Sequence, residues 1–218
     1  MYLSDRDLRY ALKCGTLLVV PPPADALIGP TSIDLHLDHV DQAKIWDIAK
    51  FKERNRSHGH GDRPELHVGT FQFKEFASEY LKRPPTYDGS AEKPQEPADL
   101  VFRRDSQIIV KKGGFVLWQT KEQVGTPEVG AQYICFVDGK STKARTGLVV
   151  HMTAPTIHAA WGAWHVTLEI GNLGPFDFVL KEDDVIAQIT VATISSAPER
   201  NMRASGSVTA GQTNVGAG

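Results

Sequence analysis

The sequence has few of the features that mark secreted, membrane or metal-scaffold proteins. Only two cysteines occur in 218 residues, Cys14 and Cys135, too few to frame a disulfide-rich secreted domain. No run approaches the roughly 18 apolar residues that a membrane-spanning helix needs, and the N-terminus has no basic segment followed by an apolar one. We therefore expect a cytoplasmic protein without membrane contact whose cysteines are reduced, packed thiols, with one disulfide between them as the alternative.

An excess of either charge is also missing. The chain has 24 Lys and Arg against 26 Asp and Glu, a formal net charge of −2. This balance gives no basic field to attract a polyanion, so we expect no nucleic-acid polymer as a partner, and a phosphate site needs a local cluster of cations and backbone amides. With 41% hydrophobic and 23% charged residues, the composition is that of an ordinary globular protein, and its length favours one domain over two.

Most of what is present predicts β-structure. Ile33, Leu35 and Leu37 alternate with polar residues, which is the pattern of a half-buried strand. Further strand candidates, separated by Gly- and Pro-containing turns, are Thr16–Val20, Leu100–Val110, Phe115–Thr120, Gln132–Val137, Leu148–Thr153, His165–Ile170, Phe176–Leu180 and Val185–Ile194. The chain is therefore predicted to be mainly β and closed as a barrel or jelly-roll-like sandwich. A short N-terminal helix precedes it, where Ser4 and Asp7 resemble a capping box.

Residues 50–99 interrupt this pattern and are interpreted as an insertion into a single domain that spans residues 1–218. Two stretches within it, Asn55–Pro64 and Arg83–Pro97, are rich in charge, Gly and Pro and predict exposed loops. Between these loops a strand and a short helix packed on the main body are predicted from Phe71, Phe73, Phe76, Tyr80 and Leu81. Residues 203–218 are small and polar, which predicts a flexible tail unless a ligand orders it.

Four motifs follow one another along the chain. They are Pro30-Thr-Ser-Ile-Asp-Leu-His-Leu, Phe136-Val-Asp-Gly-Lys-Ser-Thr-Lys-Ala-Arg-Thr-Gly-Leu, the pair Val150-His-Met-Thr-Ala and Trp164-His-Val-Thr-Leu-Glu-Ile-Gly-Asn, and Asp184-Val-Ile-Ala-Gln-Ile. In residues, order and spacing they resemble the dCTP deaminase family of the dUTPase-like superfamily. The second motif is the most specific, since it resembles that family's Asp-Gly-Arg-Ser-Ser-Leu-Ala-Arg-Leu-Gly-Leu.

The resemblance implies a dUTPase-like fold, a distorted jelly-roll or β-clip, and a homotrimer in which adjacent subunits complete each active site. It also implies hydrolytic conversion of dCTP to dUTP and ammonia. In the family, the glutamate that matches Glu169 is both general base and general acid. The serine that matches Ser141 holds the water or the leaving ammonia, and the arginine that matches Arg145 orients the glutamate. If residues 141–145 form a helical turn, Ser141 and Arg145 share one face.

Glu169 has a second interpretation from the residues alone. It follows Val166 and Leu168 in a strand pattern, where an inward-facing acid is costly unless it is paired or functional. Alternation equally allows Glu169 to point to solvent. A well-placed acid–base group contributes roughly 10²–10⁴-fold to a rate, and the family match favours that role for Glu169.

The resemblance also implies substrate contacts. Lys140 stands where the family usually has arginine and would meet the triphosphate as a point charge, whereas without the motif it would be an ordinary solvated cation. Backbone groups of Ala154 and Val166 are expected at the base edge, which leaves cytosine against uracil open. The other expected contacts are Thr142, Gln188, Arg203 and Gln212, the last in a segment that closes over the phosphates. Mg²⁺ is expected with the triphosphate, without a protein ligand.

Zinc chemistry is not predicted. Zinc-dependent cytidine deaminases use a His-x-Glu and a Pro-Cys-x-x-Cys element, and the sequence contains neither. His58 and His60 form a pair that could bind a metal, but in a polar loop such a pair is more often solvated. We therefore expect water activation without a metal.

One turn departs from the family pattern. Pro155–Trp161 lacks the family's arginine, and its aspartate becomes His158 or Ala159. In dUTPases and bifunctional deaminase–diphosphatases that aspartate activates the water that attacks the triphosphate, so its loss argues against diphosphatase activity, with His158 as a substitute base the alternative. Two other functions stay open: dUTP diphosphatase activity, alone or in series with deamination, and a silent nucleotide-binding regulator with residues 50–99 as a partner surface.

Overall fold

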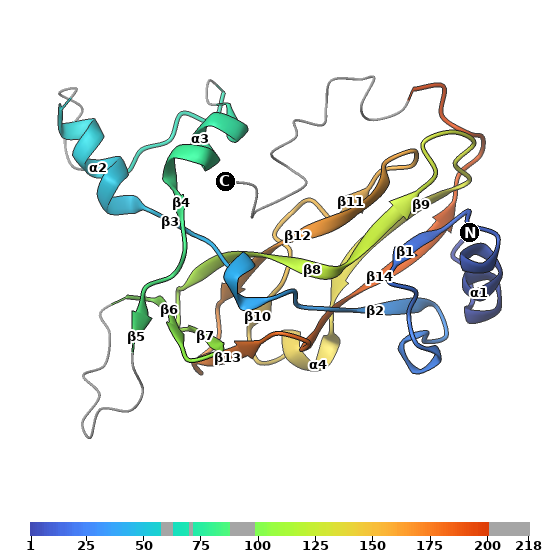
Figure 1. Cartoon of the computed structure of the whole chain (residues 1–218), viewed down its shortest axis with the longest axis horizontal. Coiled ribbons are helices and arrows are strands. Elements are labelled where there is room, and N and C mark those ends of the chain that lie inside the picture. The colour runs from blue at the N-terminus through green and yellow to red at the C-terminus, as the bar shows by residue number, and fades with distance from the viewer. Residues whose placement is uncertain (58–62, 70–71, 88–98, 201–218) are drawn as a thin grey trace.

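The computed structural model describes residues 1–57, 63–69, 72–87 and 99–200 (Figure 1). Antiparallel β-strands are the main regular structure of the described chain and form a sandwich with one helix, α1, at one end and two helices, α2 and α3, at the other (Figure 1). The mainly β, jelly-roll-like prediction is confirmed. The expected tail at residues 203–218 lies outside the described residues, as do His58, His60 and Phe71.

Two four-stranded sheets build the sandwich. The first has the order β1-β8-β12-β10, with bounds Leu18–Val20, Phe115–Thr126, Gly162–Asn172 and Leu148–Val149. The second has the order β11-β9-β14-β2, with bounds Thr156–Ile157, Tyr133–Gly139, Val185–Thr193 and Ser32–His36. Both sheets contribute to one hydrophobic core, in which Ile33, Leu168 and Ile189 are fully buried. On β2 the predicted alternation is confirmed, because Ile33 and Leu35 face this core.

A third sheet covers one end of the sandwich. Its order is β13-β7-β6-β5, with bounds Phe178–Lys181, Gln107–Val110, Val101–Arg104 and Thr86–Tyr87. The predicted single strand Leu100–Val110 is wrong, because the chain reverses at Asp105, whose φ of 55° is left-handed, and forms the hairpin β6–β7. Asp and Ser at such a position are turn residues, so this signal was present in the sequence.

The helix α1, Asp5–Lys13, begins where it was predicted, but its cap differs from a capping box. The Ser4 hydroxyl donates to an Asp7 carboxylate oxygen at 2.9 Å, and neither side chain caps a backbone group. The reason is length, since aspartate is one methylene shorter than the glutamate that reaches back in a capping box. Short 3-10 turns follow at Asp25–Leu27 and Val40–Gln42.

The predicted insertion forms a helical appendage, which we define as the described residues between Ile45 and Lys82. It contains β3, α2, α3 and β4, with bounds Ile45–Trp46, Ile48–Ser57, Phe73–Tyr80 and Leu81–Lys82. The short helix and strand are confirmed. The loop predicted from Asn55 is wrong at its start, because α2 continues to Ser57 and turns Phe51 toward Phe76 and Tyr80 of α3. α3 therefore packs on α2, and its predicted packing on the main body stays a prediction.

Backbone pairing fixes the base of the appendage to the sandwich. Ile45 and Trp46 pair with Lys82 and Leu81, so the two ends of the appendage meet in a small two-stranded sheet. Immediately before it, Lys44 exchanges backbone hydrogen bonds with Leu117 of β8 at 2.7 and 2.9 Å.

The two thiols are free, but they lie in different surroundings. Cys135 is buried on β9, and burial raises the pKa of its thiol to about 12, so it stays protonated at neutral pH. Cys14 is exposed at the end of α1, so its prediction as a packed thiol is wrong. None of the described helices is both long and apolar enough to cross a membrane.

The strand predicted over Leu148–Thr153 is also wrong in its second half. β10 ends at Val149, and residues 150–155 form an irregular segment whose last residue, Pro155, accepts a backbone hydrogen bond from Val137. Proline cannot donate to a ladder, so the chain crosses here from the first sheet to β11 of the second.

We predict that Gly147, which turns the chain from α4 (Ser141–Ala144) into β10, cannot be replaced without loss of stability. Its φ is +95°, and a Cβ there would lie 2.3 Å from the backbone nitrogen of Gly174. Gly147→Ala should lower the free energy of unfolding by about 2 kcal/mol or more, because strain and overlap add. Urea denaturation measures this. Gly130→Ala is the matched control, since Gly130 has a φ of +70° but nothing within 4 Å, and it should cost about 1 kcal/mol. Equal losses in both variants would contradict the prediction.

Candidate active site

Glu169 lies in the middle of β12 and points away from the core. Its neighbours Leu168 and Ile170 are fully buried, while Glu169 itself is half-buried opposite Leu117 of β8. Of the two directions that alternation left open for Glu169, the structure shows the outward one. The side chain is nevertheless held, because the backbone N–H of Met152 donates to Glu169 Oε2 at 3.2 Å.

The segment after β10 brings that donor to Glu169. β10 pairs with the end of β12, Val149 opposite Gly171, and the chain then runs back along the outer face of β12. Gly171 makes room for it, because a Cβ there would stand 3.0 Å from Met152 Cε. His151, the residue before Met152, has a buried Nδ1 with no hydrogen-bond partner among the described residues. Its Nε2 lies 4.0 Å from Asp138 Oδ1.

A β-bulge shapes the same sheet next to Glu169. The pairing of β12 with β8 shifts between His165 and Thr167, so Val166 stands opposite the short stretch from Thr120 to Glu122. The Val166 N–H donates to Thr120 Oγ1 at 2.9 Å, and the Thr120 hydroxyl donates to the Glu122 carbonyl at 2.7 Å. The Val166 N–H is therefore already donated to Thr120, and the expected contact of Val166 backbone groups with the base edge stays a prediction.

A buried ion pair stands behind the bulge. Glu122 is 5% exposed, and its carboxylate accepts the backbone N–H of His36 at 2.9 Å and lies 2.6 Å from His36 Nδ1. A buried carboxylate needs such partners, since leaving it unpaired costs several kcal/mol. The pair fastens β2 to β8 beneath the outer face that carries Glu169.

The helical turn α4 confirms the spacing argument for Ser141 and Arg145. The Arg145 N–H donates to the Ser141 carbonyl at 3.2 Å, so both residues lie on one face of the turn. Both side chains are exposed, and so is Thr142. Lys143 binds the turn to the second sheet through the carbonyl of Val185.

Three sequence motifs converge on Lys140. Its Nζ lies 2.5 Å from Asp34 Oδ1 and 3.4 Å from Gln188 Oε1, and Ser32 also donates to Gln188 Oε1, at 3.3 Å. Asp34 and Gln188 are paired directly across β2 and β14. Lys140 and Gln188, two of the predicted substrate contacts, therefore lie side by side in one polar cluster. The carboxylate of Asp34 offsets part of the positive charge of Lys140 in this cluster.

Not every predicted residue joins a neighbour in the single chain. Within the described part, no hydrogen bond or ion pair joins Glu169 to Ser141 or to Arg145. Ala154 is exposed in the irregular segment near Met152, and His158 is exposed in the altered turn. Arg203 and Gln212 lie outside the described residues, so their roles stay predictions.

Three side chains around these groups were not predicted from the sequence. Asp34 and His151 both lie inside the motifs that resemble the family, which could have drawn attention to them, but strand alternation does not show which residues they contact. Glu122 was missed because it lies in a strand whose predicted end was Thr120. As to metals, no group of three or more His, Cys, Asp or Glu side chains able to hold an ion occurs in the part of the chain described above.

Known proteins with similar sequences point to one family. A family model described as dCTP deaminase-like matches residues 2–194. Among curated proteins, the dCTP deaminase of Haloarcula marismortui is 28% identical over 201 residues, which cover 92% of this chain and 84% of that protein. The protein of Corynebacterium jeikeium named dCTP deaminase, dUMP-forming, is 28% identical over 91% of this chain and 85% of its own length.

A solved structure supports the fold. The 2′-deoxycytidine 5′-triphosphate deaminase from Agrobacterium tumefaciens aligns with a TM-score of 0.52 and 16% identity, over 87% of this chain and 47% of that one. At this identity the likeness concerns the fold, and the chain spans about half the length of that protein.

We predict that the Thr120 hydroxyl holds the bulge in place. Thr120 is fully buried, and Thr120→Val would keep its shape but leave the Val166 N–H and the Glu122 carbonyl without their partner. The free energy of unfolding should fall by about 1–3 kcal/mol, measured by urea denaturation. Thr120→Ser keeps the hydroxyl and should recover most of this loss, so equal effects of the two variants would argue against the hydrogen bonds as the cause.

Proposed function

The chain belongs to the dCTP deaminase-like family, and we propose that it is a hydrolase that converts dCTP and water to dUTP and ammonia. The observation that carries this proposal is the setting of Glu169. A backbone N–H fixes one oxygen of this carboxylate, Oε2, on a half-buried strand face, and no cation of the described chain pairs with it. The other oxygen is left for a proton, as a general base requires. The exposed, free Cys14 agrees with a reducing cytoplasm as the place of reaction.

The chemistry requires two proton transfers at one carbon. Water attacks C4 of the cytosine ring while Glu169 takes one of its protons, which gives a tetrahedral centre that bears the hydroxyl and the amino group. Glu169 then gives that proton to the amino group, the C–N bond breaks, and ammonia leaves. The hydroxyl proton moves to N3 of the ring, which gives the C4 carbonyl and the N3–H of dUTP. The Met152 N–H keeps the carboxylate in one orientation through both steps.

We assign Ser141 and Arg145 to the same reaction, but to the site of a neighbouring subunit. Both are exposed on α4, and neither reaches Glu169 within the described part of one chain. A homotrimer that sets α4 of one subunit against β12 of the next would bring the three groups together. Ser141 would then hold the attacking water or the ammonia, and Arg145 would orient the carboxylate and offset developing charge.

The phosphates would lie over the Lys140 cluster. A triphosphate can compete with Asp34 for the Lys140 ammonium, while Thr142 and Gln188 offer neutral hydrogen bonds. Arg203 and Gln212 would close over the phosphates from the C-terminal segment. Mg²⁺ would arrive with the nucleotide, held by phosphate oxygens, which suits a described chain that offers no cluster of acidic or imidazole ligands.

A second candidate function is the release of pyrophosphate from dUTP, in series with deamination. It is favoured by relatives whose printed names include dUMP-forming, such as those of Corynebacterium jeikeium and Thermobifida fusca. His158 would have to replace the missing aspartate as the base for the phosphate-attacking water. Its exposed place in the turn is compatible with that role but gives it no orienting partner among the described residues.

We predict that Glu169→Gln abolishes deamination. The amide keeps the size of the side chain but cannot accept the proton, so the rate of ammonia release from dCTP should fall by roughly 10²–10⁴-fold or more. An enzyme-coupled ammonia assay measures this rate, and calorimetry should show that dCTP still binds. Glu53→Gln, on exposed α2, is the control and should be fully active.

Three outcomes separate the alternatives for this reaction. Full activity of Glu169→Gln would exclude Glu169 as the base. Pyrophosphate as a product from dUTP, lost in His158→Ala, would establish the second function. Nucleotide binding with no product from the unaltered protein would leave the silent regulator as the function.

We further predict that two inactive variants complement each other. In a trimer with shared sites, Glu169→Gln and Arg145→Ala subunits each supply the residue that the other lacks. Hetero-oligomers co-expressed with two tags and purified on both contain subunits of both kinds, so about one site in three should be intact, with a comparable share of dCTP deamination regained. Hetero-oligomers of full size that stay inactive would place Arg145 and Glu169 of one chain in the same site.

A further inference from the structure

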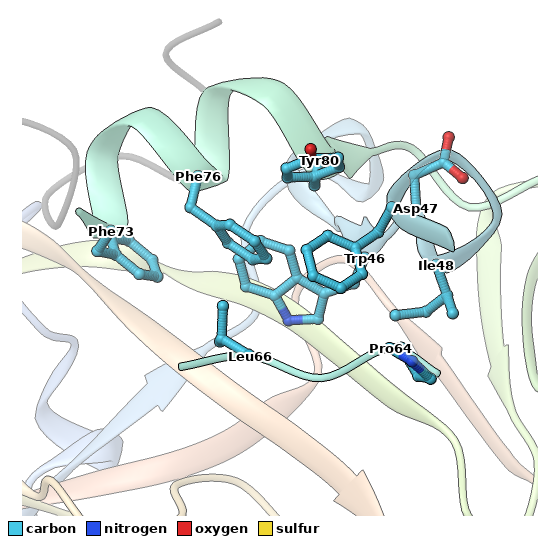
Figure 2. Close-up of a pocket in the computed structure, with 9 residues that line it drawn as sticks. Trp46, Asp47, Ile48, Pro64, Leu66, Phe73, Phe76 and Tyr80 are labelled. Atoms are coloured by element: carbon cyan, nitrogen blue, oxygen red, sulfur yellow. The ribbon is translucent and has the colours of Figure 1, made fainter. Parts of the chain in front are cut away.

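The helical appendage contains a pocket that the proposed reaction does not use. Its volume is about 210 Å³, and Figure 2 shows Trp46, Phe73 and Phe76 on one side of it, with Leu66 and Pro64 on the other. The rings form a connected wall, since the Trp46 and Phe76 centroids lie 5.1 Å apart. We call this the aromatic pocket. It opens to solvent between Ile48 and Leu66, which are 45% and 41% exposed.

Little polar capacity is left among the side chains that line the aromatic pocket. Asp47 already accepts the N–H of Lys50 at 3.1 Å and pairs with Lys82 Nζ at 3.1 Å, and the Tyr80 hydroxyl accepts from Arg54 at 2.9 Å. Trp46 lines the pocket, and in Figure 2 its indole nitrogen lies on the side toward Leu66 and Pro64, where it offers one donor. A nucleobase carries several donors and acceptors on its edge, and most would be left unpaired here. The pocket instead suits an apolar side chain with one carbonyl beside it.

The helix on the rim of the pocket is basic. α2 carries Lys50, Lys52, Arg54 and Arg56 against Glu53 alone, with Arg54 already paired to Glu79 of α3, while the whole chain has a net charge of −2. Lys52 follows Ile48 by four residues, so it stands on the same face of α2 as a residue that lines the opening. This positive rim favours an occupant with acidic residues on either side of its apolar group.

The shape of the pocket decides between kinds of partner. A membrane surface is met by apolar side chains that protrude, whereas a hollow of this size receives a group that protrudes from the partner. The volume holds one large side chain rather than a drug-sized ligand, because pockets for such ligands begin at about 300 Å³. Aromatic residues and arginine around a small hollow are also typical of the energetic centre of a protein interface.

We propose that the aromatic pocket is a docking site for an acidic protein segment, which inserts one large apolar side chain between the Trp46–Phe76 wall and Leu66. The backbone carbonyl of that segment accepts the Trp46 indole N–H, and its carboxylates face α2. This site is separate from the nucleotide site, because it lies in the appendage beyond β3 and β4 (Figure 1).

The test measures fluorescence polarisation of labelled nine-residue peptides with the full-length protein. The probe is Glu-Glu-Asp-Glu-Leu-Glu-Asp-Glu-Glu, compared with versions that carry Ala at the centre or Ser at every flanking position. The leucine peptide should bind at least about tenfold more tightly than the alanine peptide, because the leucine side chain is buried. Replacing the acidic flanks should weaken binding by a similar factor, and added salt should remove the difference.

Two variants place the binding in the pocket. Ile48→Glu puts a charge in the opening, and Lys52→Glu reverses the charge of the rim; each should weaken binding of the leucine peptide by about tenfold or more. Val129→Glu is the matched control, since Val129 is 86% exposed and lies outside the appendage, and it should bind normally. All three variants should keep full ammonia release from dCTP, which shows that they are folded and separates this proposal from the proposed function.

Other outcomes overturn the proposal. Equal affinity for the leucine and alanine peptides would leave only a charge effect on α2. Binding that survives Ile48→Glu would place the peptide elsewhere. If instead the protein sediments with vesicles of phosphatidylcholine and phosphatidylglycerol, and Ile48→Glu abolishes this, the face is a membrane contact. Self-association that Ile48→Glu abolishes, with no peptide binding, would make the occupant a second copy of the chain.

Discussion

The pairing of β8 with β12 is the constraint on which the other parts of the molecule depend. This ladder buries Leu168 and Ile170 and thereby turns Glu169 to the outer face. Its bulge at Val166 is held by the Thr120 hydroxyl, and the buried Glu122 behind the bulge is paired with the imidazole of His36 on β2. β8 also carries the bridge to Lys44 from which the appendage starts. A slip of one residue in this ladder would exchange its two faces and bury the carboxylate that the proposed reaction uses.

The second half of the site depends on charge pairing rather than on a ladder. Lys140 stands at the start of α4, and its ammonium joins Asp34 of β2 to Gln188 of β14. The pair is partly exposed, with side-chain exposures of 27% and 24%, so water and salt screen it and its contribution to stability is small. The same property suits a phosphate site, because an incoming polyanion can displace a screened carboxylate at low cost. The strands thus fix the position of α4, and the screened Lys140–Asp34 pair leaves the Lys140 ammonium available to a phosphate.

The appendage follows a different rule from the sandwich. Its apolar residues pack mostly on one another, ring against ring, and of the aromatic residues that line its pocket only Tyr80 is buried. A cluster this small cannot bury all of its own apolar surface. The apolar surface that stays exposed lies beside the basic helix α2. The main body does not need this exposed apolar surface or this basic helix in order to fold.

Local signals in the sequence determined much of this protein. Alternation determined that β2 is half-buried and that the chain is mainly β, because a strand's two faces follow directly from residue order. It left open which way Glu169 points, and the spacing of Ser141 and Arg145 gave a common face only once α4 formed a helical turn. Tertiary structure alone decided which distant groups meet: Met152 at Glu169, Asp34 at Lys140, His36 at Glu122, and the rings of α2 and α3 around one pocket. The physical reason is that a residue's periodicity fixes its direction from its own strand or helix, whereas its partner depends on how separate elements pack and register.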